Sequence, residues 1–178
     1  MARAVDRLLR PASTDRAGLI APVMTETDGR TEVRRTVLQG GRAKAYRPLA
    51  QADRRSAFLA GVAAYERGDF FLAHELLEPA WMGTDDPVER DLHQGLIKLA
   101  AGYVHAVRGN PEGMLKNLRG SRERLAAVAA TESPAIALLP AGRMLDVAAL
   151  VAAIDARIDE LVRTASVGEI DPPKLETL

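Results

Sequence analysis

The stretch F-F-L-A-H-E-L-L-E-P-A-W, from Phe70 to Trp81, carries the most structural information in the chain. On a helix its polar residues His74, Glu75 and Glu78 form one stripe, because positions three and four apart share a face. The other positions are apolar, and a helix that is apolar nearly all round is usually buried. We therefore expect the three polar groups to find partners inside the fold rather than in water.

Helical patterns continue on both sides of this stretch. Phe58, Val62 and Tyr65 recur at the intervals of an amphipathic helix with one buried side. Gly68 is a typical helix stop, so the two helices should form a short antiparallel hairpin. Because proline lacks an N–H and crowds the preceding turn, the second helix should kink at Pro79 or end within a turn of it.

Further helices are predicted by their caps and apolar faces. The cap residues expected before helices are Asp69, Asp85 or Asp86, Asn110 and Asp146. The expected inward faces are Leu92, Leu96, Leu99 and Tyr103, then Met114, Leu118, Leu125 and Val128, then Val147, Leu150, Val151, Ile154, Ile158 and Leu161. The sequence therefore predicts an all-α fold, a compact bundle of about five helices over residues 48–165, followed by an extended, proline-containing tail over 166–178.

The first 47 residues differ from the rest in charge and pattern. They hold ten Lys or Arg and five Asp or Glu, whereas the remainder holds 14 and 19. We interpret residues 1–47 as an irregular basic arm, in which Thr31–Leu38 forms a short strand or a helical turn. Aromatic residues for base stacking are nearly missing from it, which disfavours nucleic acid and favours contact with the acidic body or a neighbouring subunit.

Composition narrows the protein class further. The 178-residue chain has no cysteine, which excludes disulfides, thiolate metal sites and cysteine nucleophiles. No apolar run approaches a signal peptide or the ~20 residues of a membrane span. We expect a cytoplasmic monomer or homodimer without membrane contact.

A second polar stripe lies on the helix predicted from Pro87 to about Arg108. Its members are Arg90, Gln94, Lys98 and His105, which fall within one sector at ~100° per residue. If this helix packs antiparallel to Phe70–Trp81, the two stripes face each other. His93 sits off the stripe and is expected at the surface or at the edge of the core.

Three segments carry a resemblance to a known family. They are Y-E-R-G-D-F-F-L-A-H-E-L-L-E-P-A-W (Tyr65 to Trp81), E-R-D-L-H-Q-G-L-I-K-L-A-A-G-Y-V-H (Glu89 to His105) and R-G-N-P-E-G (Arg108 to Gly113). With them the chain resembles, over roughly residues 55–130, the bacterial and archaeal helical family known as domain of unknown function 309. The resemblance implies a compact helical bundle and no agreed activity. The motif positions it carries over are His74, Glu75, Glu78, Trp81, Arg90, Gln94, Gly95 and His105. Pro79 and Lys98 depart from the family pattern, and Lys98 would offset one carboxylate.

Two functional interpretations follow from the polar stripes. In the first, the protein is not an enzyme and binds a small anionic ligand or a protein partner, with a largely structural polar cluster between the second and third helices. The candidate ligand-binding residues are His74, Trp81, Arg90, Gln94 and Lys98.

In the second interpretation, the protein is a hydrolase-type enzyme that uses the same cluster. Glu75 or Glu78 would be the general base and His105 the acid. A divalent metal could be held by His74, Glu78 and His105, but H-E-x-x-E lacks the second His of the H-E-x-x-H zinc motif. We therefore assign no metal and no other cofactor. Phosphate loops, nucleophile elbows and dinucleotide fingerprints are absent from the sequence.

Overall fold

The computed structural model describes residues 19–27, 30–39, 42–45, 48–131, 144–168 and 170–175. The chain divides into two compact units, Met1–Tyr46 and Arg47–Leu178, and each is described here by itself. The first 18 residues of the predicted arm and residues 169 and 176–178 of the predicted tail lie outside the described residues.

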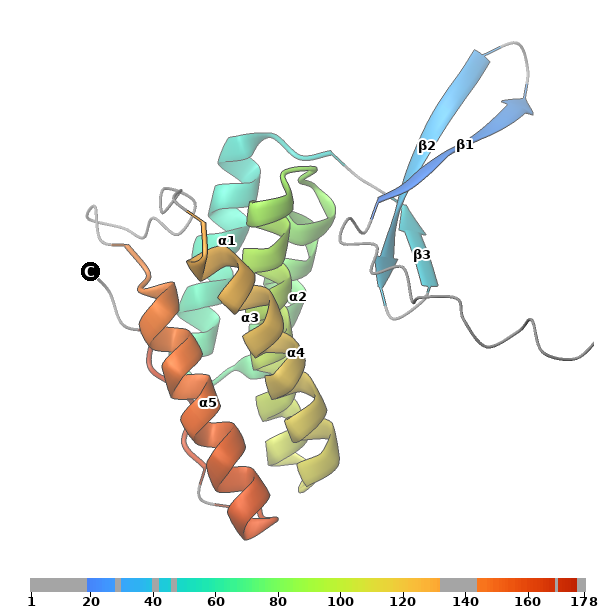
Figure 1. Cartoon of the computed structure of the whole chain (residues 1–178). Helices are drawn as coiled ribbons and strands as arrows, with labels where there is room; N and C mark the ends of the chain where they lie inside the picture. Colours follow the sequence, from blue (N-terminus) through green and yellow to red (C-terminus); the bar gives the residue numbers. More distant parts are fainter. Residues whose placement is uncertain are drawn as a thin grey trace, which may run out of the picture. The chain divides into compact units, whose positions relative to one another are not determined.

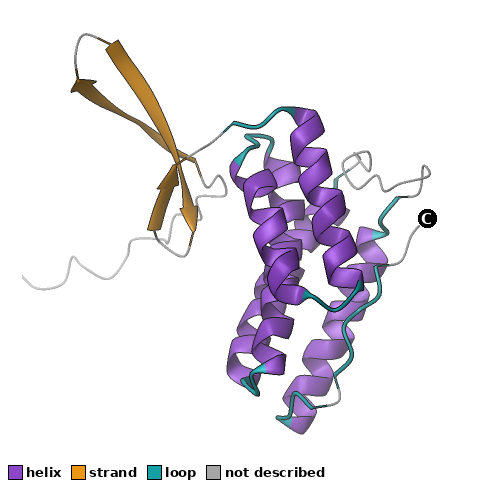
Figure 2. Ribbon diagram, turned by 180° about the vertical axis from the view of Figure 1, so that it is seen from behind, coloured by secondary structure: helices purple, strands orange, loops and turns teal. Residues whose placement is uncertain are grey.

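The larger unit is the predicted all-helical bundle, which is confirmed (Figure 1). Its described residues form five helices, α1 (Gln51–Glu66), α2 (Phe70–Met82), α3 (Pro87–Val107), α4 (Pro111–Ala129) and α5 (Val147–Thr164). Helices that follow one another in the sequence pack against one another. Seen from behind, the described part of the helical unit is drawn as helices joined by loops (Figure 2).

The helix boundaries follow the predicted stop and cap signals. Gly68 and Gly109 have φ angles of 79° and 65°, a conformation that glycine adopts at little cost after a helix. The capping side chains accept a hydrogen bond from a main-chain N–H three residues later: Asp69 from Leu72, Asp86 from Glu89, Asn110 from Gly113 and Asp146 from Ala149. The predicted helix starts are therefore confirmed.

The core forms where the apolar faces of the helices meet. The predicted faces of α3 and α4 are buried throughout, and on α5 only Val151 and Ile158 are partly exposed. Helices α3 and α4 approach closely at Gly95, where an added Cβ would lie 2.6 Å from Leu125 Cγ. The hydroxyl of Ser121 donates to the Gly95 carbonyl at 2.8 Å, which ties the two backbones at this crossing.

Helix α2 differs from the expectation that it would be buried all round. Phe71 is 62% exposed and Leu72 is 38% exposed, whereas Leu77 and Trp81 are buried. The reason is that α2 has neighbours, α1 and α3, on part of its surface only. Pro79 lies inside α2, which ends three residues later at Met82, so the prediction of an end within a turn is confirmed.

The smaller unit contains three strands, β1 (Leu19–Thr27), β2 (Arg30–Gln39) and β3 (Arg42–Ala45), in an antiparallel sheet of order β1-β2-β3. This differs from the irregular arm expected from the sequence, while the strand alternative for Thr31–Leu38 is confirmed within β2. The missed sequence signal is the pair of two-residue turn dipeptides. Asp28-Gly29 separates two runs that contain Thr and Val, and Gly40-Gly41 follows the second of them.

Residues 170–175 of the C-terminal tail lie in extended conformation against the helices. Within the described part of the chain, no helix has both the length and the hydropathy that crossing a bilayer requires.

Candidate functional site

The polar stripe of α2 lies closer to solvent than the sequence predicts. The side chains of His74 and Glu75 are 27% and 51% exposed, and His74 Nδ1 lies 3.1 Å from Glu75 Oε1. Glu78 is half-buried one turn further along. The α2 stripe therefore lies at the rim of the bundle, where water can solvate the carboxylate of Glu75.

Trp81 and Arg90 form a contact between α2 and α3. Both residues are buried, at 2% and 8% exposure. The guanidinium carbon of Arg90 lies 5.8 Å from the centroid of the Trp81 ring, within the range of a cation–π interaction. One end of the predicted stripe on α3 thus does face α2, as antiparallel packing of α2 and α3 requires.

Lys98 and His105 lie against α4 instead. An added Cβ on Gly120 would lie 3.0 Å from Lys98 Nζ, and one on Gly113 would overlap the His105 ring. His105 Nδ1 also lies 3.2 Å from the side-chain nitrogen of Asn110. Burial, followed by the nearby Arg124 guanidinium, lowers the pKa of Lys98.

Helix geometry explains why the second stripe is divided between two neighbours. Positions four apart advance by about 40° at ~100° per residue, so Lys98 lies about 80° round the helix from Arg90. That rotation is enough to carry a side chain from the α2 side to the α4 side. Gln94, half-buried, lies between the two directions.

The three candidate metal ligands named from the sequence do not form a metal site in the described part of the chain. No group of three or more His, Asp or Glu side chains that could hold a metal ion occurs among the described residues, which include His74, Glu78 and His105. The catalytic roles of Glu75, Glu78 and His105 remain hypotheses drawn from the sequence.

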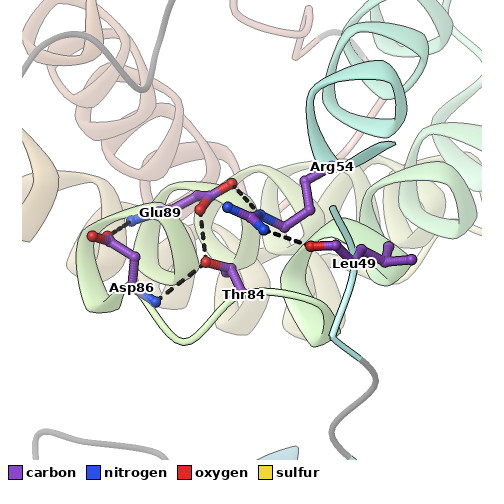
Figure 3. Close-up of polar contacts among 5 residues, drawn as sticks. All are labelled: Leu49, Arg54, Thr84, Asp86 and Glu89. Carbon is purple, nitrogen blue, oxygen red and sulfur yellow. Dashed lines mark hydrogen bonds and ion pairs between the residues drawn. The ribbon is translucent and has the colours of Figure 1, made fainter. Parts of the chain in front are cut away.

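A half-buried network that the sequence analysis missed joins α1 to the start of α3 (Figure 3). Arg54 Nε donates to Glu89 Oε1 at 2.9 Å, and the Thr84 hydroxyl donates to Glu89 Oε2 at 2.6 Å. Arg54 Nη1 also donates to the Leu49 carbonyl at 2.6 Å. Both carboxylate oxygens of Glu89 therefore have donors, and charge-assisted bonds of this kind fix the ends of three segments.

The turn before α3 completes this network. The main-chain N–H of Asp86 donates to the Thr84 hydroxyl at 3.2 Å, and the Asp86 carboxylate caps α3 by accepting from the Glu89 N–H at 2.7 Å. Its sequence signal is the T-D-D-P-V-E pattern from Thr84 to Glu89, in which an acidic cap precedes proline and a glutamate. A carboxylate with both oxygens engaged suits a structural role better than a catalytic one.

His93 lies in the core, and not at the surface or the core edge, where the sequence analysis placed it. It is 2% exposed, and its ring centroid lies 5.7 Å from that of Phe58 on α1. Burial lowers the pKa of His93 to about 4, with Glu89 opposing the effect and Arg54 adding to it. Its Nδ1 atom is buried without a hydrogen-bond partner in the described part of the chain. His93 is therefore a neutral, apolar-packed imidazole at physiological pH.

An apolar hollow lies where α2 begins and α3 ends. It has a volume of about 280 Å³ and is lined by Gly68, Asp69, Phe70, Phe71, Val104, Val107 and Arg108. We call it the α2–α3 hollow. Phe71 and Val107 are 62% and 80% exposed, and the opposite charges of Asp69 and Arg108 flank them. Sequence reasoning missed it because the apolar start of α2 was expected to be covered.

Comparison with known proteins gives one match. The chain matches no curated protein and no solved structure. A family model described as a domain of unknown function, DUF309, matches residues 58–117, from the middle of α1 into α4. This segment contains Trp81 and Arg90 at the α2–α3 contact and Glu89 of the half-buried network. It has the helical fold that the resemblance implied. Residues 58–117 of this protein therefore belong to the DUF309 family of domains of unknown function.

Proposed function

We propose that this protein is a non-enzymatic helical module that binds a protein partner through the α2–α3 hollow. The observation that carries the proposal is the exposure of Phe71 and Val107 side by side on the lining of one hollow. Single exposed apolar side chains are common, but apolar residues gathered at a hollow with a polar rim are typical of interaction sites.

The charges around the hollow support a protein partner over a small anion. Asp69 and Arg108 lie on the same lining, so the rim offers both signs, and the Asp69 carboxylate would repel an anionic ligand. An anion site on α3 would require Arg90 and Lys98 to converge. Their contacts direct Arg90 toward Trp81 and Lys98 toward Gly120 instead.

The expected contribution of each apolar side chain to binding follows from its burial in the complex. Complete burial of a phenylalanine or valine side chain contributes about 1.5–3 kcal/mol. Replacement of Phe71 by a polar residue should therefore weaken binding roughly ten- to a hundredfold, since each 1.4 kcal/mol changes Kd tenfold.

The experiment identifies the partner with the full-length protein as bait and then measures Kd with both proteins purified. Phe71→Ser and Val107→Ser are the test variants. Val162→Ser is the matched control, because Val162 is 59% exposed on α5, away from the hollow's lining. We expect loss of binding in the first two variants and unchanged binding in the control. Equal affinities in all four proteins would refute the proposal.

The hydrolase alternative has a separate test. It assigns Glu75 or Glu78 as base and His105 as acid, or alternatively a divalent metal held by His74, Glu78 and His105. Hydrolytic activity that disappears in both Glu78→Gln and His105→Gln, or metal retained by wild type and not by His74→Ala, would favour the enzyme over the binding module.

A further inference from the structure

The C-terminal segment I-D-P-P-K-L, residues 170–175, lies on the bundle in the manner of a bound peptide. Ile170 and Leu175 are 6% and 8% exposed and Pro173 is fully buried, whereas Asp171 and Lys174 are exposed. The segment has no helix or strand of its own. It is held by the side chains of Ile170, Pro173 and Leu175, which are buried against the helices, as the anchor residues of extended peptides are on their receptors.

Its polar contacts go through its own main chain. The Tyr103 hydroxyl donates to the Asp171 carbonyl at 2.9 Å, and the Tyr65 hydroxyl donates to the Pro173 carbonyl at 3.1 Å. Arg157 Nε adds a bond of 3.2 Å to the same Asp171 carbonyl. Every main-chain acceptor named here belongs to the tail and every donor to the helices, so these bonds do not depend on the side chains that the tail carries.

The two tyrosine donors belong to a group of rings in edge-on and tilted contact that we call the aromatic shelf, Tyr65, Phe70 and Tyr103. The ring of Phe70 lies 5.3 Å from Tyr65 and 5.2 Å from Tyr103, centroid to centroid. Burial raises the pKa of both tyrosines, so their hydroxyls keep the proton that they donate. Its three rings come from α1, α2 and α3, so the helices alone contribute the shelf.

The tail does not fill the space beside the shelf. A hollow of about 580 Å³ lies there, lined by Tyr65, Glu66 and residues 171–175. A longer or bulkier segment would find unoccupied volume next to Tyr65.

We propose that the aromatic shelf is a recognition site for an extended, proline-containing segment of another protein, and that residues 170–175 occupy it as an intramolecular ligand. Prolines pre-organise a peptide in the extended polyproline II conformation and carry no N–H that would be left unpaired. Aromatic grooves that donate hydrogen bonds to carbonyls are a general solution for binding such segments. The site is separate from Phe71 and Val107 and so goes beyond the proposed function.

Intramolecular occupancy has a quantitative consequence. A tethered segment acts at an effective concentration in the millimolar range, so it competes strongly with the same sequence supplied in solution. Binding in trans should therefore be weak to the wild-type chain and should strengthen when the tail's own anchors are weakened.

The test uses the full-length chain and a fluorescein-labelled peptide of residues 170–178, with binding measured by fluorescence anisotropy. The tail-weakened variant is Ile170→Ala with Leu175→Ala, and Val162→Ala on the exposed side of α5 is the matched control. We expect the tail-weakened variant to bind the peptide roughly tenfold or more tightly than the wild type and the control do. Adding Tyr65→Phe or Tyr103→Phe should weaken this binding about fivefold each, by removal of one donor.

Three controls keep the test decisive. Far-UV circular dichroism reports whether each variant is folded, and Leu175→Ala alone is a milder variant that must show the same direction of change. A peptide with both prolines replaced by alanine should bind more weakly. Folded variants that bind no peptide, or bind it regardless of the two tyrosines, would overturn the proposal. So would a wild-type dimer that the tail variant converts to monomer, because the occupant would then be a second copy's tail.

Discussion

The buried imidazole of His93 should make the bundle less stable in mild acid. Its pKa is about 4 in the folded chain, below the ordinary value of 6.5, because burial disfavours the charged ring. Above pH 6.5 the ring is neutral in both states and its full contribution is present. As the pH falls toward 4, the unfolded chain binds a proton that the folded chain does not bind, so the free energy of unfolding falls.

The size of this effect follows from the two pKa values. The gap between 6.5 and about 4 corresponds to about 3 kcal/mol, at roughly 1.4 kcal/mol per pH unit, and the loss is complete near pH 4. That is a large fraction of the ~5–15 kcal/mol typical of a domain.

Urea unfolding at several pH values tests this expectation. The comparison is between the wild type and His93→Leu, with His105→Gln as a control that keeps the buried ring. Carboxylates titrate in the same window, so the informative quantity is the difference between the pH profiles. We expect His93→Leu to lack about 3 kcal/mol of the acid-induced loss seen in the other two proteins. Parallel profiles for all three proteins would refute the assignment of His93 as a buried neutral group.

Three further substitutions test the helix packing, the half-buried network and the cap of α5 by urea unfolding at neutral pH. Gly95→Ala should destabilise by about 1–3 kcal/mol, because the new methyl would lie 2.6 Å from the buried Leu125. Gly168→Ala should not, because its new methyl would lie 3.7 Å from the Ser166 hydroxyl, an ordinary contact distance. Glu89→Gln should cost about 1–3 kcal/mol, because it weakens the bonds from Arg54 and Thr84, whereas Glu75→Gln at the rim should stay within about 0.5 kcal/mol. Asp146→Ala should cost about 1 kcal/mol by removing the cap of α5, and an unchanged midpoint would contradict the capping role.

The helices were predictable because their signals are local. A capping aspartate or asparagine accepts a hydrogen bond from an N–H three residues later. Asp69 and Asn110 therefore predict a helix start from neighbouring residues alone. Apolar periodicity likewise predicted which faces of α3 and α4 are buried.

The partners of polar side chains were less predictable, because they depend on which neighbour each face meets. Arg90 and Lys98 share a stripe in sequence, yet one stacks on Trp81 of α2 and the other lies over Gly120 of α4. Arg54 and Glu89 are 35 positions apart, and no local pattern relates them. His93 illustrates the same limit, since its burial comes from Phe58 on another helix.

Two neighbouring rings at the start of α2 connect the two proposed binding surfaces. Residues adjacent in a helix point about 100° apart, so Phe70 packs between Tyr65 and Tyr103 while Phe71 remains 62% exposed on the α2–α3 hollow. The two surfaces should therefore separate by substitution. Phe71→Ser should weaken partner binding and leave tail-peptide binding unchanged. Phe70→Ser should weaken both and also lower the urea midpoint, because Phe70 lines the hollow and supports the shelf. A Phe71 variant that released the tail would mean that the two surfaces form one site.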